Sequence, residues 1–376
     1  MNVMLYISAP ILAVLILVFY YYFVRRACMA TGIIDTERRS VRAVTLLLAA
    51  CLALLSCSIF SLGAIFSLHV IAVALLMQFI NFIVKCIGKS KYKNGFAVWK
   101  KIYGSGIVPV IVAVAMMVFG FVNMNNIVET DYTVYTQKNI REQGYTVALI
   151  ADVHFGVSVD ITELKSICND ISKKNVDIVV LCGDIVDENT TASGMREVFA
   201  ALGGITSNYG VFYVYGNHDR QPYTDDKTFG ADQLRKTIED SGITILSDEV
   251  YAVNDELVIV GREDRSYGKT DRKSIADLIS DVDRNKFILT VDHQPTEYKE
   301  NGQAGTDLLL SGHTHGGQIW PANIIFDLFG LNDAVYGYTR INKTTQAIVT
   351  SGLAGWGFPV KTVAPAEYVI IKIKGK

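Results

Sequence analysis

The chain has 376 residues, is 50% hydrophobic and carries a formal net charge of −2. A prior of roughly 150 residues per domain allows more than one domain in this length. The near-neutral charge excludes a general electrostatic attraction to nucleic acid, so we expect no nucleic-acid partner.

Apolar residues are concentrated before residue 125, in runs without a charged residue. A bilayer core requires about 20 apolar residues per helix. We expect one span at Val3–Val24, two spans within residues 43–84 that turn near Ser61-Leu62-Gly63, and a fourth at Gly104–Val122. Residues 1–125 are therefore expected to form an all-α transmembrane region of four helices. The alternatives are a buried helical core and, for the first segment, a cleaved signal peptide.

Basic residues between the expected spans predict the orientation of the chain, because Lys and Arg favour cytoplasmic loops. They lie after the first span (Arg25, Arg26, Arg38, Arg39 and Arg42) and after the third (Lys85, Lys89, Lys91, Lys93, Lys100 and Lys101). With both stretches in the cytoplasm, everything after the fourth span is extracytoplasmic. We therefore expect a multi-pass protein of the cell membrane.

After an expected linker at residues 126–144, the pattern changes to alternating strands and helices. Short apolar runs predict buried strands at residues 146–151, 177–182 and 211–215, with helices from Asp160 onward and at residues 192–202. This alternation predicts parallel βαβ units. Denser strands follow and suggest a second sheet; they are expected at residues 257–260, 287–291, 307–310, 347–350 and 368–373.

Polar motifs follow five of these expected strands. They are Asp152-Val-His154, Gly183-Asp184, Gly216-Asn217-His218-Asp219, Asp292-His293 and Gly312-His313-Thr-His315. Singly, such residues are usually turn formers or satisfied core and surface residues. Together they predict one site, because ligand sites gather at the carboxyl ends of strands in α/β sheets. His, Asp and Asn are ligands of divalent metals, and paired metals promote displacement at phosphorus.

The spacing within two motifs bears on side-chain direction. Asp152 and His154 are two residues apart, as are His313 and His315. An extended backbone would point both members of each pair the same way.

These motifs, extended to Asp187, resemble the calcineurin-like metallophosphoesterases. The run Gly312–Gln318, with Pro321 nearby, is similar to the membrane-associated bacterial branch of that family. The resemblance covers about residues 140–375 and none of the expected spans. It implies a four-layer α/β sandwich at residues 145–376, with two mixed β-sheets flanked by helices and two metal ions between the sheets.

The resemblance also implies the role of each residue. Asp152, His154 and His315 would hold one metal, Asn217, His293 and His313 the other, and Asp184 would bridge them. Nitrogen and oxygen ligands suit Mn²⁺, Fe or Zn²⁺. A water between the metals would become the attacking hydroxide. His218 would act beside the phosphate with Asp219 as its partner, although a purely structural role for His218 stays open.

Four further positions have two interpretations each. Arg262-Glu-Asp-Arg265 could meet an anionic substrate or form a solvated turn. The glycine-rich segment Ser351–Phe358 is followed by Lys361, where relatives often carry an arginine that could clamp a phosphate. Tyr223 and Trp320 could line a substrate pocket, but core packing is favoured for both.

The sequence therefore predicts a membrane-anchored, metal-dependent phosphoesterase acting on a phosphomonoester, phosphodiester or pyrophosphate. Membrane lipids and a phosphorylated, lipid-linked substrate are the expected partners. The alternatives are a metal-binding sensor or scaffold with a vestigial site, and a transport unit. The expected spans lack the Asp, Glu, Lys or Arg that would mark a transport pathway, and His69 is left unexplained. The sequence specifies neither the natural substrate nor the oligomeric state.

Overall fold

A computed structural model describes residues 3–31, 35–56, 58, 60–88, 93–267 and 272–376. The chain divides into two compact units, Met1–Gly120 and Phe121–Lys376. Lys89 and Lys91, on which part of the expected orientation depends, lie outside the described residues.

The first unit consists of helices. They are α1 (Val3–Thr31), α2 (Arg39–Leu55), α3 (Leu62–Gly88), α4 (Lys93–Ser105) and the greater part of α5 (Ile107–Met124). Three described helices, α1, α3 and α5, are long and apolar enough to cross a membrane. The expected number of four spans was wrong by this measure. The expected turn near Ser61 does divide the long apolar run. The helix before it, α2, has only 17 residues, and it includes the charged residues Arg39 and Arg42.

His69, the polar residue left unexplained in the second half of that run, is buried in α3. Its Nδ1 lies 2.7 Å from the Ile65 carbonyl oxygen, one helical turn earlier. This contact within the helix satisfies a ring nitrogen locally, so a polar side chain here does not require a transport pathway.

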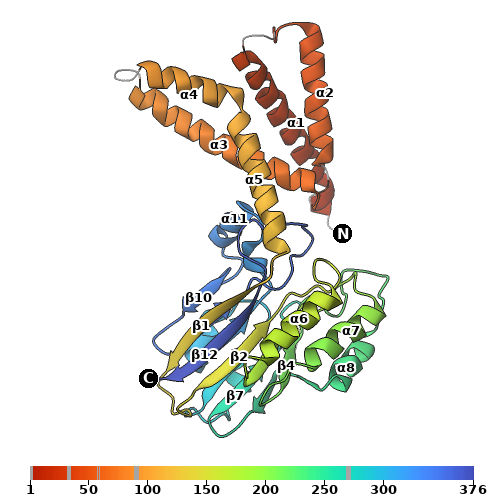
Figure 1. The fold of residues 1–376 in the computed structure, drawn as a ribbon, viewed down its shortest axis with the longest axis vertical. Helices are drawn as coiled ribbons and strands as arrows, with labels where there is room; N and C mark the ends of the chain where they lie inside the picture. Colours follow the sequence, from red (N-terminus) through yellow and green to blue (C-terminus); the bar gives the residue numbers. More distant parts are fainter. Residues whose placement is uncertain (1–2, 32–34, 57, 59, 89–92, 268–271) are drawn as a thin grey trace. The chain divides into compact units, whose positions relative to one another are not determined.

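The second unit contains two six-stranded sheets (Figure 1). Sheet 1 has the order β1-β12-β2-β3-β4-β5, and sheet 2 has the order β10-β11-β9-β8-β7-β6. The strands of sheet 1 are β1 (Val128–Thr136), β2 (Tyr145–Ile150), β3 (Ile178–Cys182), β4 (Val211–Val214), β5 (Ile243–Ile245) and β12 (Glu367–Gly375). Those of sheet 2 are β6 (Glu249–Ala252), β7 (Leu257–Gly261), β8 (Phe287–Val291), β9 (Leu308–Ser311), β10 (Gly337–Arg340) and β11 (Gln346–Val349).

The predicted βαβ units are confirmed. Strands β2 to β5 pair in parallel and are joined by α6 (Ile161–Ser172), α7 (Ala192–Gly203) and α8 (Ala231–Asp240). These helices cover one face of sheet 1 (Figure 1). Helix α6 begins where expected, because the Asp160 carboxylate accepts hydrogen bonds from the backbone N–H groups of Thr162 and Glu163.

Alternate residues of the central strands belong to two different cores. In β3, Val179 and Leu181 pack with the helices, whereas Ile178, Val180 and Cys182 face sheet 2. On the outer face of sheet 2 lie α9 (Ile275–Leu278) and α10 (Tyr298–Ala304). The expected four-layer sandwich of two mixed sheets between helices is confirmed. Strands buried on both faces explain the unbroken apolar runs in the sequence.

The expected linker at residues 126–144 was wrong. Residues 128–136 form β1, an edge strand that pairs in parallel with β12 over nine residues. One of its faces stays partly exposed, so its sequence, VETDYTVYT, carries polar residues that resemble a linker more than a buried strand.

Candidate metal centre

Both sheets direct polar side chains to one site. In sheet 1, Asp152, Asp184 and Asn217 follow the carboxyl ends of β2, β3 and β4 within three residues. In sheet 2, His293 and His313 follow β8 and β9 in the same way. Parallel strands thus bring together residues that lie up to 163 positions apart, from Asp152 to His315.

The backbone at the site is not extended, contrary to the expectation for Asp152 and His154. Five of the predicted residues have φ between +38° and +70°: Asp152, His154, Asp184, His313 and His315. L-residues adopt this left-handed conformation at a cost of about 1–3 kcal/mol each. Such strain persists only where surrounding contacts fix it, so the convergence of these side chains depends on tight loops after the strands.

The predicted ligands form two adjacent groups. The ligand atoms of Asp152, His154 and His315 lie within 4.8 Å of one another, and so do those of Asp184, His293 and His313. Asn217 joins the second group, with its Oδ1 2.8 Å from His313 Nδ1. The structure therefore brings together all seven residues named from the sequence, in the two sets that the resemblance implied.

Asp184 faces both groups. Its Oδ2 lies 3.1 Å from His293 Nε2 and 3.8 Å from His154 Nε2. A carboxylate in this position can interact with cations in either group, as expected of a bridging ligand.

Hydrogen bonds to the second ring nitrogen orient two of the imidazoles. His293 Nδ1 lies 2.8 Å from the Cys182 carbonyl oxygen, and His315 Nδ1 lies 3.1 Å from that of Ala354. Because a carbonyl only accepts, each Nδ1 carries a proton and each Nε2 faces the site, where it could bind a metal ion.

Metal ions would fit this arrangement, because it contains buried ring nitrogens without a hydrogen-bond partner. The Nε2 atoms of His154 and His293 are buried and make no hydrogen bond. His293 Nε2 also lies 3.1 Å from an Asp184 oxygen. Burial alone would lower the pKa of His293, but Asp184 raises it well above its usual value. Two acceptors held this close in a buried site repel each other unless a proton or a cation lies between them. Imidazole, carboxylate and amide ligands are suited to Mn²⁺, Fe or Zn²⁺.

The pKa values of the cation-free chain show the electrostatic cost of assembling the site. Burial raises the pKa of Asp152 to about 6, with the nearby Asp184 contributing. Burial lowers the pKa of His313 to about 3, with the charge on His293 contributing. His313 is thus neutral, as a ligand must be, and Asp152 is a carboxylate that a neighbouring cation would stabilise.

His218 lies beside the two groups, but its partner differs from the expected one. Its Nδ1 is 2.8 Å from Glu188 Oε2, and its backbone N–H donates to Asp184 Oδ1. Burial alone would lower the pKa of His218, yet the bond to Glu188 raises it overall. Glu188 was not identified from the sequence, although it lies only four residues after Asp184 in an acid-rich run.

Asp219 was wrongly expected to orient His218. Its carboxylate is fully buried and accepts hydrogen bonds from four backbone N–H groups, those of Gly216, Asp184, Ile185 and Val186. Asp219 therefore fixes the loops after β3 and β4 to each other. It positions Asp184, not the imidazole.

Two aromatic rings border His218. The ring of Trp356 lies 4.7 Å from the imidazole, centroid to centroid, and that of Tyr223 lies 4.9 Å from it. Tyr223 is 61% exposed, so the favoured expectation of core packing was wrong for this residue. Trp320 is half-buried, and its backbone N–H donates to Thr362 Oγ1.

Lys361 supports the glycine-rich segment and does not reach toward a phosphate. Its side chain is fully buried, and its ammonium donates to the carbonyl oxygens of Ser351, at 2.5 Å, and Gly352, at 3.4 Å. Burial lowers the pKa of Lys361 to about 7. The phosphate clamp that an arginine would provide is therefore not formed by this lysine.

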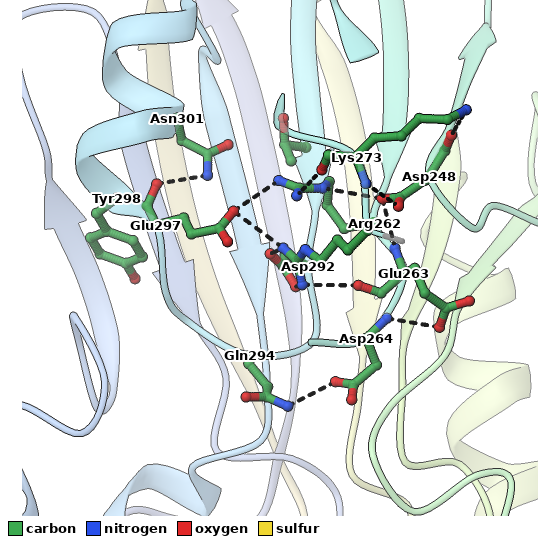
Figure 2. A network of polar contacts seen from close by, with 12 residues as sticks. Asp248, Arg262, Glu263, Asp264, Lys273, Asp292, Gln294, Glu297, Tyr298 and Asn301 are labelled. Atoms are coloured by element: carbon green, nitrogen blue, oxygen red, sulfur yellow. Dashed lines mark hydrogen bonds and ion pairs between the residues drawn. The ribbon is translucent and has the colours of Figure 1, made fainter. Parts of the chain in front are cut away.

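A buried ionic network lies behind His293 (Figure 2). The neighbouring carboxylate, Asp292, is fully buried and pairs with Arg272. Arg262 is also fully buried and contacts Asp248, Glu297 and the Lys273 carbonyl oxygen. Arg262 is therefore not part of a solvated turn, whereas Arg265 is exposed in the turn that follows it. An anionic substrate at this segment stays a prediction. The network ties β7 to the end of β8 that carries His293.

Comparisons with known proteins agree with this geometry. Residues 145–317 match the sequence model of the calcineurin-like phosphoesterase family. An "Uncharacterized metallophosphoesterase" from Helicobacter pylori is 28% identical over 235 residues, which are 61% of this chain and 60% of the relative. One from Aquifex aeolicus is 28% identical over 65% of this chain and 91% of its own length. A "Transmembrane protein with metallophosphoesterase domain" from Danio rerio is 26% identical over 71% of this chain and 62% of its own length.

Replacing Asp219 distinguishes its observed role from the expected one. Asp219→Asn puts an amide donor among four backbone donors, so we expect unfolding to become easier by about 2 kcal/mol or more. Thermal or denaturant unfolding of the detergent-solubilised chain measures this, with Asp232→Asn on the exposed face of α8 as the matched control. Unchanged stability with lost activity would instead support a direct partnership with His218.

Proposed function

Because residues 145–317 match the sequence model of the calcineurin-like phosphoesterase family, we propose that this chain hydrolyses phosphoester bonds with two divalent metal ions. The observation that carries the proposal is the pair of buried ligand groups that share Asp184. The chain spans about 60% of the length of the first relatives it matches. The activity proposed for the whole protein is therefore argued from its own residues.

Each ligand group would hold one ion. Asp152, His154 and His315 would bind the first, and Asn217, His293 and His313 the second, with Asp184 between them. When bound, the ions would lower the pKa of a shared water and neutralise charge on the phosphate oxygens. The protein's own contribution is to hold imidazole, amide and carboxylate ligands together in a buried site before substrate arrives.

His218 is suited to act on the leaving group. It is oriented by Glu188, whose hydrogen bond favours the protonated ring, and it faces the exposed ring of Tyr223. A protonated imidazole at the edge of the site can donate to the departing oxygen. Trp356 and Tyr223 would exclude water from this side of the substrate.

We infer that the protein is a multi-pass membrane protein whose second unit faces away from the cytoplasm. The basic residues around α1, α2 and α4 support this orientation. This orientation requires α2 to cross the bilayer in addition to α1, α3 and α5. Helix α2 is shorter than those three, but its 17 residues reach the lower limit for a span. A substrate at the membrane surface, either lipid-linked or a lipid head group, follows from this tethering.

Loss of Asp184 should abolish catalysis and weaken binding of both metals. In Asp184→Asn we expect hydrolysis of bis-p-nitrophenyl phosphate and p-nitrophenyl phosphate to fall at least about a hundredfold. Metal analysis of the same samples should show fewer than two ions per chain. Dialysis against a chelator should inactivate the wild type, and added Mn²⁺ should restore it. Asp232→Asn should retain full activity, and turnover by Asp184→Asn near that of the wild type would refute the mechanism.

Substrates with different leaving groups test the role of His218. His218→Asn should slow hydrolysis of phenyl phosphate by about 10²–10⁴-fold, because phenolate leaves poorly without a proton. It should slow hydrolysis of p-nitrophenyl phosphate much less. Glu188→Gln should show the same dependence of the rate on the leaving group, but with a smaller loss. Equal losses with both esters would indicate that His218 has only a structural role.

Cysteine labelling tests the orientation. We expect a membrane-impermeant maleimide to label Asp225→Cys, in an exposed loop of the second unit, in intact spheroplasts. It should label Lys100→Cys, on α4, only after the membrane is permeabilised. The wild type, with its native cysteines, provides the background. The reverse pattern would place the second unit in the cytoplasm.

A further inference from the structure

The second unit exposes a short apolar helix, α11 (Ala322–Leu328), in which no described residue is buried. With the residues that follow it, α11 presents six large apolar side chains to solvent: Ile324 (48% exposed), Ile325 (46%), Phe326 (51%), Leu328 (81%), Phe329 (76%) and Leu331 (61%). Asp327 is the only charged residue between Ile324 and Leu331. Folded domains rarely leave so many neighbouring apolar side chains in water, unless the surface binds something.

This helix is the tip of a loop with a closed base. The Thr314 hydroxyl donates to the Val335 carbonyl oxygen at 2.6 Å, which joins the two ends of the loop. Gly317, inside the base, would clash with Asn323 and Val335 if it carried a side chain. Figure 1 shows α11 beyond the end of β10, off the faces of the sheets. The apolar side chains are therefore held away from both protein cores.

The loop base is hydrogen-bonded to residues 361–364, which are also hydrogen-bonded to the end of α5. Trp320 N–H donates to Thr362 Oγ1, and Thr362 N–H donates to the Gln318 carbonyl oxygen. Within the same unit, the Asn123 amide donates to the carbonyl oxygens of Lys361 and Ala364. Asn123 is the penultimate residue of α5, a helix apolar and long enough to cross a membrane. Residues 361–364 thus connect the exit from that helix to the base of the α11 loop.

These contacts select a lipid bilayer among the possible occupants of the surface. If α5 spans the membrane, then Asn123 lies at its boundary, and α11 begins within a few hydrogen-bonded residues of that boundary. A second protein would have to compete with a bilayer that chain connectivity already places there. The sparse charge of the loop favours insertion into the apolar edge of the bilayer over attraction to charged head groups.

We propose that the loop around α11, residues 318–336, inserts its apolar tip into the same bilayer as the helices of the first unit. His315, one of the candidate metal ligands, lies three residues before this loop. Insertion would hold the metal centre at the bilayer surface and present it to amphiphilic phosphoesters whose acyl chains remain in the membrane. The insertion of this surface does not depend on the proposed function. The choice of an amphiphilic substrate does rest on the proposed function.

Depth-dependent quenching tests insertion without any activity. Phe329→Trp is made in the full chain, which is reconstituted in phosphatidylcholine vesicles with or without lipids brominated on their acyl chains. The matched control is Tyr135→Trp, a 51% exposed position near the C-terminal end of β1, the end farther along the chain from α5. Beyond the wild-type signal, bromine should quench the added fluorescence of Phe329→Trp by about half and leave that of Tyr135→Trp unchanged.

Equal quenching at the two positions would overturn the proposal. So would an emission from Phe329→Trp that is unquenched but blue-shifted as protein concentration rises, because a second copy of the chain would then cover α11.

A charged variant tests the consequence for substrate. Leu328→Asp/Phe329→Asp changes only exposed side chains, so the fold and the turnover of bis-p-nitrophenyl phosphate should be retained. Hydrolysis of phosphatidic acid in vesicles, measured as released phosphate, should fall about tenfold or more. Equal rates on phosphatidic acid for the variant and the wild type would refute the amphiphilic substrate. Wild-type inactivity on both substrates, with quenching intact, would refute the proposed function and leave the insertion surface standing.

Discussion

The structure of the second unit depends on the burial of the Asp184 carboxylate among imidazoles. Its Oδ2 faces the Nε2 atoms of His293 and His154, neither of which makes a hydrogen bond. Burying acceptors against each other costs free energy that only a positive charge between them can recover. Two sheets, five loops and the surrounding hydrogen bonds all serve to hold this otherwise unfavourable arrangement. Such a centre favours cations, because its side chains supply negative charge and lone pairs but few hydrogen-bond donors.

Buried charged side chains hold the loops around this centre by hydrogen bonds to the backbone. Asp219 binds four N–H groups from two loops, and Lys361 binds the carbonyl oxygens of a third. Five site residues adopt left-handed backbone conformations within these loops. Charged groups buried against the backbone can fix such conformations, since each satisfies several peptide groups at once. The network of Arg262, Arg272 and Asp292 plays the same part behind His293.

Much of the fold and of the ligand set was predictable from the sequence. Strands buried on both faces, such as β3 and β8, appear as unbroken apolar runs, and the ligands follow them at once. Strand β1 was missed because a half-exposed edge strand carries polar residues. Glu188 was missed and Asp219 was assigned wrongly, because neighbours in sequence do not determine which way a side chain points after a sharp turn. The exposure of α11 was also unpredictable, since an apolar run does not reveal whether another element covers it.

The position of β12 has a consequence for biosynthesis. This strand lies between β1 and β2, although more than 200 residues separate it from either in sequence. Sheet 1 therefore cannot close while residues 367–375 are still on the ribosome. If the second unit crosses the membrane, β1 and the β12-facing edge of β2 must wait unpaired on the far side until residues 367–375 have also crossed. During such a delay the unpaired strand edges are prone to aggregate. A chaperone at the exit of the translocation channel could bind these edges until β12 arrives.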